Sequence, residues 1–433
     1  MRKIIKTILY DWQNKQIPDI LPRKINLEQF LRAKPKKILA ITGFRRVGKT
    51  FLCFELINKL SKKFSRQEMV YINFEDERIP LKTDFLTQLL PTIKETFDKN
   101  LKILILDEVH NVPLWSKWLR RVYDNENIQI LVTGSSSKMS SQEIPTEIRG
   151  RCLETSILPL SFIEFLQFKN IVFDPKAIDF SQTDQGNLRK SFNEYLQYGA
   201  LPEIILSDKT RKFEVLQQYY KTVIQKDIVE RFKIKNQEGL KALLLLLLNS
   251  TYYSANKLYN NLKSLNYKIG KTTLLHYISH IETSYFLYSL PIFSYKIKNQ
   301  LQYARKAYFV DNGFISALST KFTNNFGRLY ENLVFIELKR RQKHDFALFY
   351  WRDETGKEVD FVVKQNLKIS QLIQVCYNLD DPDTKKREIE SLIRAGRELK
   401  CNNLLVITQD FEGEEKIKNK KINFIPLWKW LLK

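Results

Sequence analysis

The first third of the chain repeats one pattern, a short continuous apolar run followed by a longer stretch with helical spacing of apolar residues. Continuous apolar runs fit strands that are buried on both faces, and strands that alternate with helices predict a parallel sheet. Residues 36–184 are therefore predicted to form an α/β domain. Its expected strands lie at Lys37–Ile41, Met69–Asp76, Leu101–Leu106 and Ile128–Val132.

The segment Gly43–Thr50 follows the first run and has the spacing G-x-x-x-x-G-K-[ST] of a phosphate-binding loop. Glycine lets the backbone approach a phosphate, and the first N–H groups of a helix attract an anion. Lys49 is expected to reach the β- and γ-phosphates, and Thr50 to offer its hydroxyl to Mg²⁺. The alternative is a Gly-Lys turn without a ligand. The residues assigned to the nucleotide are Gly43, Arg45, Arg46, Val47, Gly48, Lys49, Thr50 and Phe51.

Two carboxylates, Asp107 and Glu108, end the third run. Ligands collect at the carboxyl ends of parallel strands, so Asp107 is expected to hold Mg²⁺ and Glu108 to act as a general base toward water. Ser135 or Thr133, at the end of the fourth run, is expected to hydrogen-bond that water. The alternatives are a solvated acidic turn and ordinary turn serines. ATP and Mg²⁺ are the predicted ligands.

Beyond residue 184 the pattern becomes helical as far as residue 240, as in a lid-like region. Residues 241–320 fit a winged helix, with helices after Ser254 and Gly270 and strands at 286–290 and 307–310. Lys268 and Lys271 would then lead a helix of the kind that enters a DNA major groove. The alternative is a packing module.

The two ends of the chain differ from these regions. Residues 321–433 have a separate α/β pattern, with a helix expected at 329–341 and strands at 347–352, 358–363, 372–377 and 403–408. Residues 1–35 are expected to form an N-terminal strap that Pro18 and Pro22 interrupt.

Composition limits the class of protein. The formal net charge of +23 favours a polyanionic partner such as nucleic acid, and the alternative is that the lysines are solvated surface.

The four cysteines have no paired spacing, which argues against disulfides or a zinc site and for a reducing interior. Leu243–Leu248, the longest apolar run, is too short to span a bilayer, and no signal peptide is recognised. A cytoplasmic protein is expected. Its assembly, as a homo-oligomer or with another protein, is left open.

The motifs resemble those of prokaryotic AAA+ superfamily ATPases of the archaeal-ATPase type. The likeness rests on Gly43–Thr50, Leu106-Asp107-Glu108-Val109-His110, Thr133-Gly134-Ser135-Ser136 and Gly150-Arg151. The resemblance implies an ASCE-type P-loop domain and an ATP-hydrolysing switch or motor. It also implies an arginine finger at Arg151 or Arg149. For Arg45 and Arg46 it implies contact with phosphate or a neighbouring subunit, whereas an ion pair to Glu75 or Asp76 is the alternative.

The C-terminal region resembles the domain of unknown function that commonly follows such ATPases, which is similar to PD-(D/E)XK nucleases. The likeness implies acidic positions at Glu331 and Asp360, whereas the third motif reads Gln374-Val375-Cys376 and lacks its carboxylate and lysine. Lys364 shares a strand face with Glu358 and Asp360, so a displaced lysine stays open. We expect no nuclease activity, and we expect the carboxylates to pair with residues such as Arg352 or Lys357. An ATP-gated nuclease and a non-catalytic nucleotide-dependent regulator are the alternatives.

Overall fold

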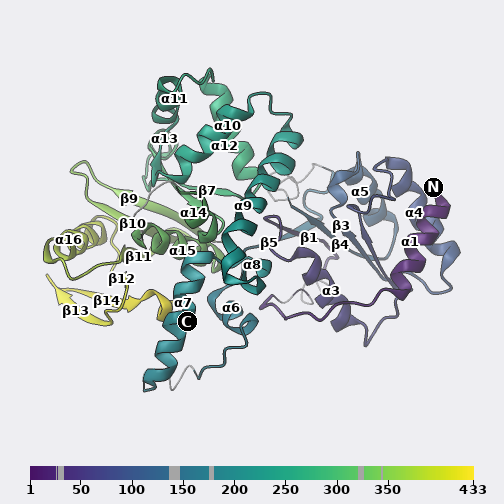
Figure 1. The fold of residues 1–433 in the computed structure, drawn as a ribbon, viewed down its shortest axis with the longest axis horizontal. Helices are drawn as coiled ribbons and strands as arrows, with labels where there is room; N and C mark the ends of the chain where they lie inside the picture. Colours follow the sequence, from purple (N-terminus) through teal and green to yellow (C-terminus); the bar gives the residue numbers. More distant parts are fainter. Residues whose placement is uncertain (26, 28–33, 136–146, 175–179, 320–325, 343–344) are drawn as a thin grey trace. The chain divides into compact units, whose positions relative to one another are not determined.

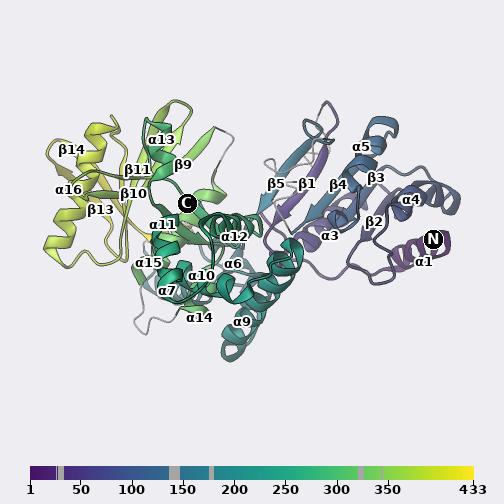
Figure 2. The same ribbon diagram turned by 90° about the horizontal axis from the view of Figure 1, so that it is seen from above.

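The computed structural model describes residues 1–433 except 26, 28–33, 136–146, 175–179, 320–325 and 343–344. The chain forms two compact units, one of residues 1–158 with 283–285 and one of residues 159–282 with 286–433 (Figure 1). Figure 2 shows the strands of each unit from above.

The first unit contains a parallel sheet that has five strands within the described residues, in the order β2-β3-β4-β1-β5. Strand β4 lies between β1 and β3 and runs parallel to both. The segments that follow these three strands therefore leave the sheet at its carboxyl-terminal end. The strands are β1 (Ile38–Gly43), β2 (Met69–Asn73), β3 (Ile103–Asp107), β4 (Gln129–Gly134) and β5 (Cys152–Ile157).

The helices of this unit pack on the sheet. They are α1 (Arg2–Asn14), α3 (Lys49–Leu60), α4 (Thr83–Thr96) and α5 (Trp115–Asn125). Alternate strand residues such as Ile38, Val70 and Leu104 share one core with apolar side chains of α1, α4 and α5. α3 packs against β1 and β4. The predicted parallel α/β sheet is confirmed.

Helix α1 lies within the segment that was expected only as a strap. Ile5, Ile8, Leu9 and Trp12 follow the i, i+3, i+4, i+7 spacing of a helix with one apolar face, and all four are buried. The indole N–H of Trp12 donates to the carbonyl oxygen of Met69 at 2.7 Å, so the helix is fastened to β2.

The second unit begins with helices, as the pattern from 185 to 240 predicts. A π-helical segment, η4 (Val223–Glu230), continues directly from α9. The α-helices are α6 (Phe162–Phe168), α7 (Gln182–Tyr198), α8 (Pro202–Leu206), α9 (Lys212–Thr222) and α10 (Gln237–Leu248). No helix in the described part of the chain combines the length and the apolar character needed to cross a bilayer.

A small antiparallel sheet follows, in the order β6-β8-β7. The predicted helices after Ser254 and Gly270 and the predicted strand positions are confirmed, and the Ser254 side chain accepts the Lys257 N–H at 3.3 Å. The elements are β6 (Tyr252–Tyr253), α11 (Ala255–Ser264), α12 (Lys271–Thr283), β7 (Leu287–Leu290), α13 (Ile297–Gln302), β8 (Arg305–Phe309) and α14 (Asn312–Leu318).

The last sheet is mixed, in the order β13-β14-β12-β11-β10-β9. The expected helix and four strands are present, and helix α16 packs on β10 and β11 around a shared apolar core. The elements are α15 (Phe326–Arg340), β9 (Phe346–Arg352), β10 (Glu358–Gln365), β11 (Lys368–Cys376), α16 (Pro382–Glu398), β12 (Leu404–Thr408), β13 (Gly413–Ile417), β14 (Lys420–Pro426) and α17 (Leu427–Trp430).

Candidate nucleotide site

The phosphate-loop segment connects β1 to α3 through a loop with unusual backbone angles. Gly43, Arg46 and Gly48 have φ values of 144°, 67° and 94°. A Cβ added to Gly43 would lie 2.4 Å from the carbonyl oxygen of Ile157 on β5, so only glycine fits there. Val47 is fully buried and anchors the loop.

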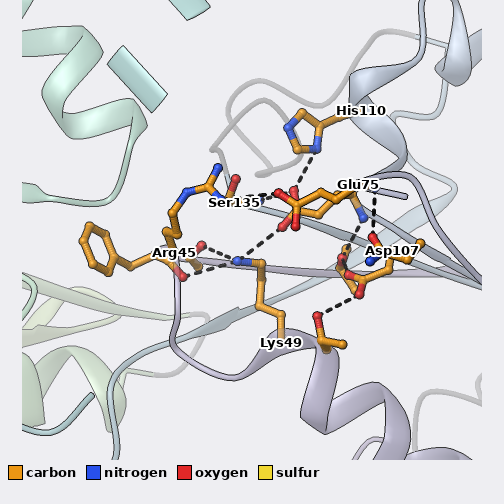
Figure 3. A network of polar contacts seen from close by, with 12 residues as sticks. Arg45, Lys49, Glu75, Asp107, His110 and Ser135 are labelled. Atoms are coloured by element: carbon orange, nitrogen blue, oxygen red, sulfur yellow. Dashed lines mark hydrogen bonds and ion pairs between the residues drawn. The ribbon is translucent and has the colours of Figure 1, made fainter. Parts of the chain in front are cut away.

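Lys49 is the first residue of α3 and is only 6% exposed. Its ammonium donates to the carbonyl oxygens of Gly43 (3.2 Å) and Phe44 (3.3 Å) and lies 3.5 Å from a carboxylate oxygen of Glu108 (Figure 3). The positive charge is therefore held over the loop by the backbone that surrounds it.

Asp107 is the centre of a buried hydrogen-bond network. The hydroxyls of Thr50 and Tyr71 both donate to its Oδ2 at 2.7 Å, and the hydroxyl of Thr133 donates to Oδ1. Burial raises the pKa of Asp107, as does the charge of Glu108, and the three hydroxyl donors oppose that rise. The predicted pair of Mg²⁺ ligands, Thr50 and Asp107, is thus in direct contact.

Glu108 has a left-handed backbone with φ of 56°, which is strained for a residue with a Cβ. Its N–H donates to Thr133 Oγ1 (3.0 Å), and its carboxylate accepts the N–H of Ser135 (3.1 Å) and lies 3.4 Å from His110 Nδ1. Burial alone would raise the pKa of Glu108, but Lys49, His110, the Ser135 N–H and Arg45 together more than offset this effect, and the pKa lies below its usual range. Glu108 is therefore held as a carboxylate.

The other predicted residues are placed as follows. The guanidinium of Arg45 lies 3.3 Å from Glu75, which is the ion pair named as the alternative. The side chains of Arg46 and Phe51 are exposed. Ser135 joins the network through its backbone N–H, whereas Ser136 lies outside the described residues.

Arg151 is not brought to this site within its own chain. Its carbonyl accepts the N–H of Ile38 at 2.8 Å, at the end of β1 opposite to Gly43, and its side chain pairs with Asp124 on α5 at 3.0 Å. The strand thus separates Arg151 from the phosphate loop of its own chain, and the arginine finger at Arg151 or Arg149 stays a prediction.

Two site residues carried no predicted role. Tyr71 was only part of a strand, although a tyrosine in a buried strand needs a partner for its hydroxyl. His110 was quoted in a motif, and its place two residues after Glu108 was the available signal. Both contact the acidic pair.

The residues present fit a nucleotide with Mg²⁺. The buried ammonium of Lys49 and the first turn of α3 suit a phosphate, and the oxygens of Thr50 and Asp107 are ligands of the kind that Mg²⁺ prefers. When bound, Mg²⁺ would neutralise phosphate charge.

The C-terminal carboxylates are also brought together, but their partner was predicted wrongly. Glu331, Glu358 and Asp360 all pair with Lys306 of β8. Lys357 pairs instead with Glu390, at 2.9 Å. The sequence gives no local signal for Lys306 as the partner, because it precedes the first of these carboxylates by 25 residues and belongs to another sheet.

The parallel sheet, the phosphate loop and the acidic pair define a P-loop nucleotide-binding domain. Residues 35–166 match the family model described as an AAA domain, which implies nucleotide binding. Residues 189–325 and 326–430 match two domains of unknown function, DUF8612 and DUF4143.

The chain is 40% identical to an uncharacterized protein of Methanocaldococcus jannaschii, MJ1544, over 94% of this chain and 91% of that protein. It belongs to the same family. An uncharacterized protein of Haemophilus influenzae is 26% identical over 94% of this chain and 98% of its own length. The Walker-type ATPase PABY2304 of Pyrococcus abyssi is 14% identical with a TM-score of 0.46, over 70% of this chain and 99% of that one.

Proposed function

We propose that the first unit binds ATP with Mg²⁺ and hydrolyses it, and that the protein works as an AAA+ type switch or motor. The observation that carries the proposal is the contact of Thr50 with Asp107. This contact lies beside Lys49 and Glu108, at the carboxyl-terminal ends of the adjacent strands β1, β3 and β4. An isolated ion pair would account for Lys49 and Glu108 alone. Here four polar residues from two segments, the start of α3 and the end of β3, lie together, with Lys49, Asp107 and Glu108 buried and Thr50 partly buried.

The residues have separate roles in this proposal. Lys49 and the loop amides bind the β- and γ-phosphates, and Thr50 and Asp107 hold Mg²⁺. Glu108 accepts a proton from the attacking water, the Ser135 N–H holds its carboxylate, and Thr133 Oγ1 accepts its backbone N–H. An arginine finger, if the protein assembles as a homo-oligomer, would come from Arg149 or Arg151 of a neighbouring copy.

Two substitutions test the proposal. Lys49→Ala should abolish ATP binding, measured by calorimetry with Mg²⁺, because it removes the buried ammonium at the start of α3. Glu108→Gln should keep binding and lower the turnover by roughly 10²–10⁴-fold, because amide nitrogen replaces a basic oxygen. Lys62→Ala, an exposed lysine shortly after α3, is the control. Unchanged turnover in Glu108→Gln would exclude Glu108 as the base. Tight binding without any turnover in the wild type would favour the non-catalytic regulator.

A second candidate is a nucleic-acid partner for the winged-helix-like module. Residues 239–310 hold nine lysines and arginines and a single acidic residue, Glu282, a net charge of +8 within 72 residues. Seven of these lysines are exposed, and six of the seven lie on or beside α11, α12 and α13: Lys257, Lys263, Lys268, Lys271, Lys296 and Lys298. Segregation of charge of this kind favours phosphate contacts over a uniformly solvated surface.

The matched experiment compares two pairs of lysines by fluorescence anisotropy with duplex DNA over a range of salt. Lys268→Gln/Lys271→Gln should weaken binding and reduce the slope of log K against log salt by about 2. Lys62→Gln/Lys63→Gln, in the other unit, should leave the slope unchanged. Absence of binding at low salt would exclude this partner, and equal losses in both pairs would place the contact elsewhere.

A further inference from the structure

Lys306 sits at the centre of the three carboxylates of the second unit. Its ammonium nitrogen is 2.8 Å from Glu331, 2.7 Å from Glu358 and 2.7 Å from Asp360. The ammonium donates hydrogen bonds to Glu331 and Asp360 and lies within ion-pair distance of Glu358. One side chain therefore contacts all three carboxylates of the cluster.

The surroundings leave Lys306 no access to solvent. The residue is 1% exposed, and its ammonium lies over the rings of Tyr252 (5.3 Å) and Tyr350 (5.8 Å). Aromatic faces attract a cation and exclude water, so the two rings further stabilise the charged form of Lys306.

The carboxylates are held independently of the lysine. The Tyr308 hydroxyl donates to the same Glu331 oxygen at 2.6 Å, and the Val375 N–H donates to the second oxygen of Asp360 at 2.8 Å. Gln374 accepts the Asp360 N–H at 3.2 Å, so this position of the third motif supports the backbone of β10. Buried carboxylates in such a cluster need a cation, because burying several like charges without one is strongly unfavourable.

We propose that Lys306 is the resident cation of the Glu331–Glu358–Asp360 cluster and occupies the place that a divalent metal takes in nucleases. A metal ion would need the same oxygens at 2.0–2.6 Å, roughly where the nitrogen now lies. Among the residues that the structure describes, no group of three or more His, Cys, Asp and Glu is placed to hold a metal.

The ion pairs of Lys306 join two parts of the second unit. Lys306 belongs to the β6-β8-β7 sheet, whereas Glu331 lies on α15 and the other two carboxylates lie on β10. The ion pairs therefore lock the basic module to the C-terminal sheet without a metal. The Ile292–Tyr350 bridge and the Phe293 N–H bond to the Tyr350 carbonyl (2.6 Å) join the same two parts.

The test measures Mn²⁺ binding and thermal unfolding of the full chain without nucleotide. All proteins carry Asp107→Asn, so that the phosphate-loop site takes no metal. Lys306→Ala should lower the unfolding midpoint of the second unit by about 10 °C, because it uncovers buried like charges. Millimolar Mn²⁺ should raise the midpoint again in this variant alone, and adding Asp360→Asn should remove that rescue. Lys357→Ala, which removes a partly exposed ion pair, should change neither quantity.

The proposal also has readouts that do not require Lys306→Ala to fold. Lys306→Met/Asp360→Asn should be more stable than Lys306→Met, because the second change removes one unpaired charge. Mn²⁺ binding by the chain with Lys306 intact, lost on Asp360→Asn, would overturn the proposal. Cleavage of plasmid or single-stranded DNA in Mg²⁺ that disappears in Asp360→Ala would overturn it as well, and would make Lys306 part of a nuclease site.

Discussion

Asn332 should be among the residues whose loss is most damaging in the second unit. It lies on α15, is 1% exposed, and its side-chain oxygen accepts the N–H of Phe309 at 2.7 Å. Its amide nitrogen donates to the carbonyl of Phe309 (3.0 Å) and to the side-chain oxygen of Asn312 (2.9 Å). Leucine has a similar size, so Asn332→Leu removes these three bonds without opening a large cavity.

The magnitude follows from what the substitution leaves behind. Phe309 loses the partners of its N–H and its carbonyl, and Asn312 loses one acceptor contact, all in a buried region. Each buried group without a partner destabilises by about 1–3 kcal/mol, so the free energy of unfolding should fall by about 4 kcal/mol. For a unit of this size, that corresponds to a midpoint lower by about 10 °C.

Differential scanning calorimetry of the full chain can follow the transition of each unit. Asn332→Leu should shift the transition of the second unit and leave that of the first unit in place. Asn260→Leu, an exposed position on α11, is the matched control and should change the midpoint by less than about 2 °C. A similar small shift for Asn332→Leu would refute the reasoning, because it would mean that water replaces the side chain at no loss.

Three further predictions concern single residues. Gly43→Ala should weaken ATP binding at least about tenfold in calorimetry, because its Cβ would meet the Ile157 carbonyl at 2.4 Å, whereas Gly186→Ala, with no neighbour within 4 Å, should not. Gly199→Ala should destabilise the second unit in thermal unfolding, since φ is +79° and a Cβ would lie 1.6 Å from Asp311. Burial raises the pKa of Asp311 to about 6 against two backbone N–H donors. The folded protein thus holds the Asp311 proton more tightly than the unfolded chain does. The stability that Asp311 contributes is therefore fully present below about pH 4 and is lost as the pH rises through about 6. Asp311→Asn should flatten that part of the stability–pH profile, although it also removes the acceptor of one of the two backbone N–H groups; a profile unchanged by the substitution would contradict this.

The sequence predicted the first unit well because its signals are local. Continuous apolar runs mark buried parallel strands, and the polar residues at their ends mark the site. β5 and the β13–β14 hairpin were not predicted, since Cys152–Ile157 contains glutamate and threonine and Gly413–Ile417 is mostly charged and exposed. Their strand character depends on pairing with neighbours.

The contacts of the candidate sites were harder to predict because they join distant segments. Nothing in the local pattern connects Tyr71 to Asp107, or Lys306 to Asp360, which is 54 residues further along. The fold also separates motifs that follow one another in the sequence. Arg151 comes shortly after the other site motifs, but it lies at the start of β1, whereas the phosphate loop follows the end of that strand.

The position of Lys306 bears on how these genes can change. The boundary between the DUF8612 and DUF4143 segments falls between residues 325 and 326, yet the lysine lies on one side and its three carboxylates on the other. Recombination at this boundary with an unrelated gene would leave Lys306 buried without its carboxylates in one product and the three carboxylates without a cation in the other. Selection should therefore keep the two segments together, and a substitution at Lys306 should persist only where the carboxylates change with it.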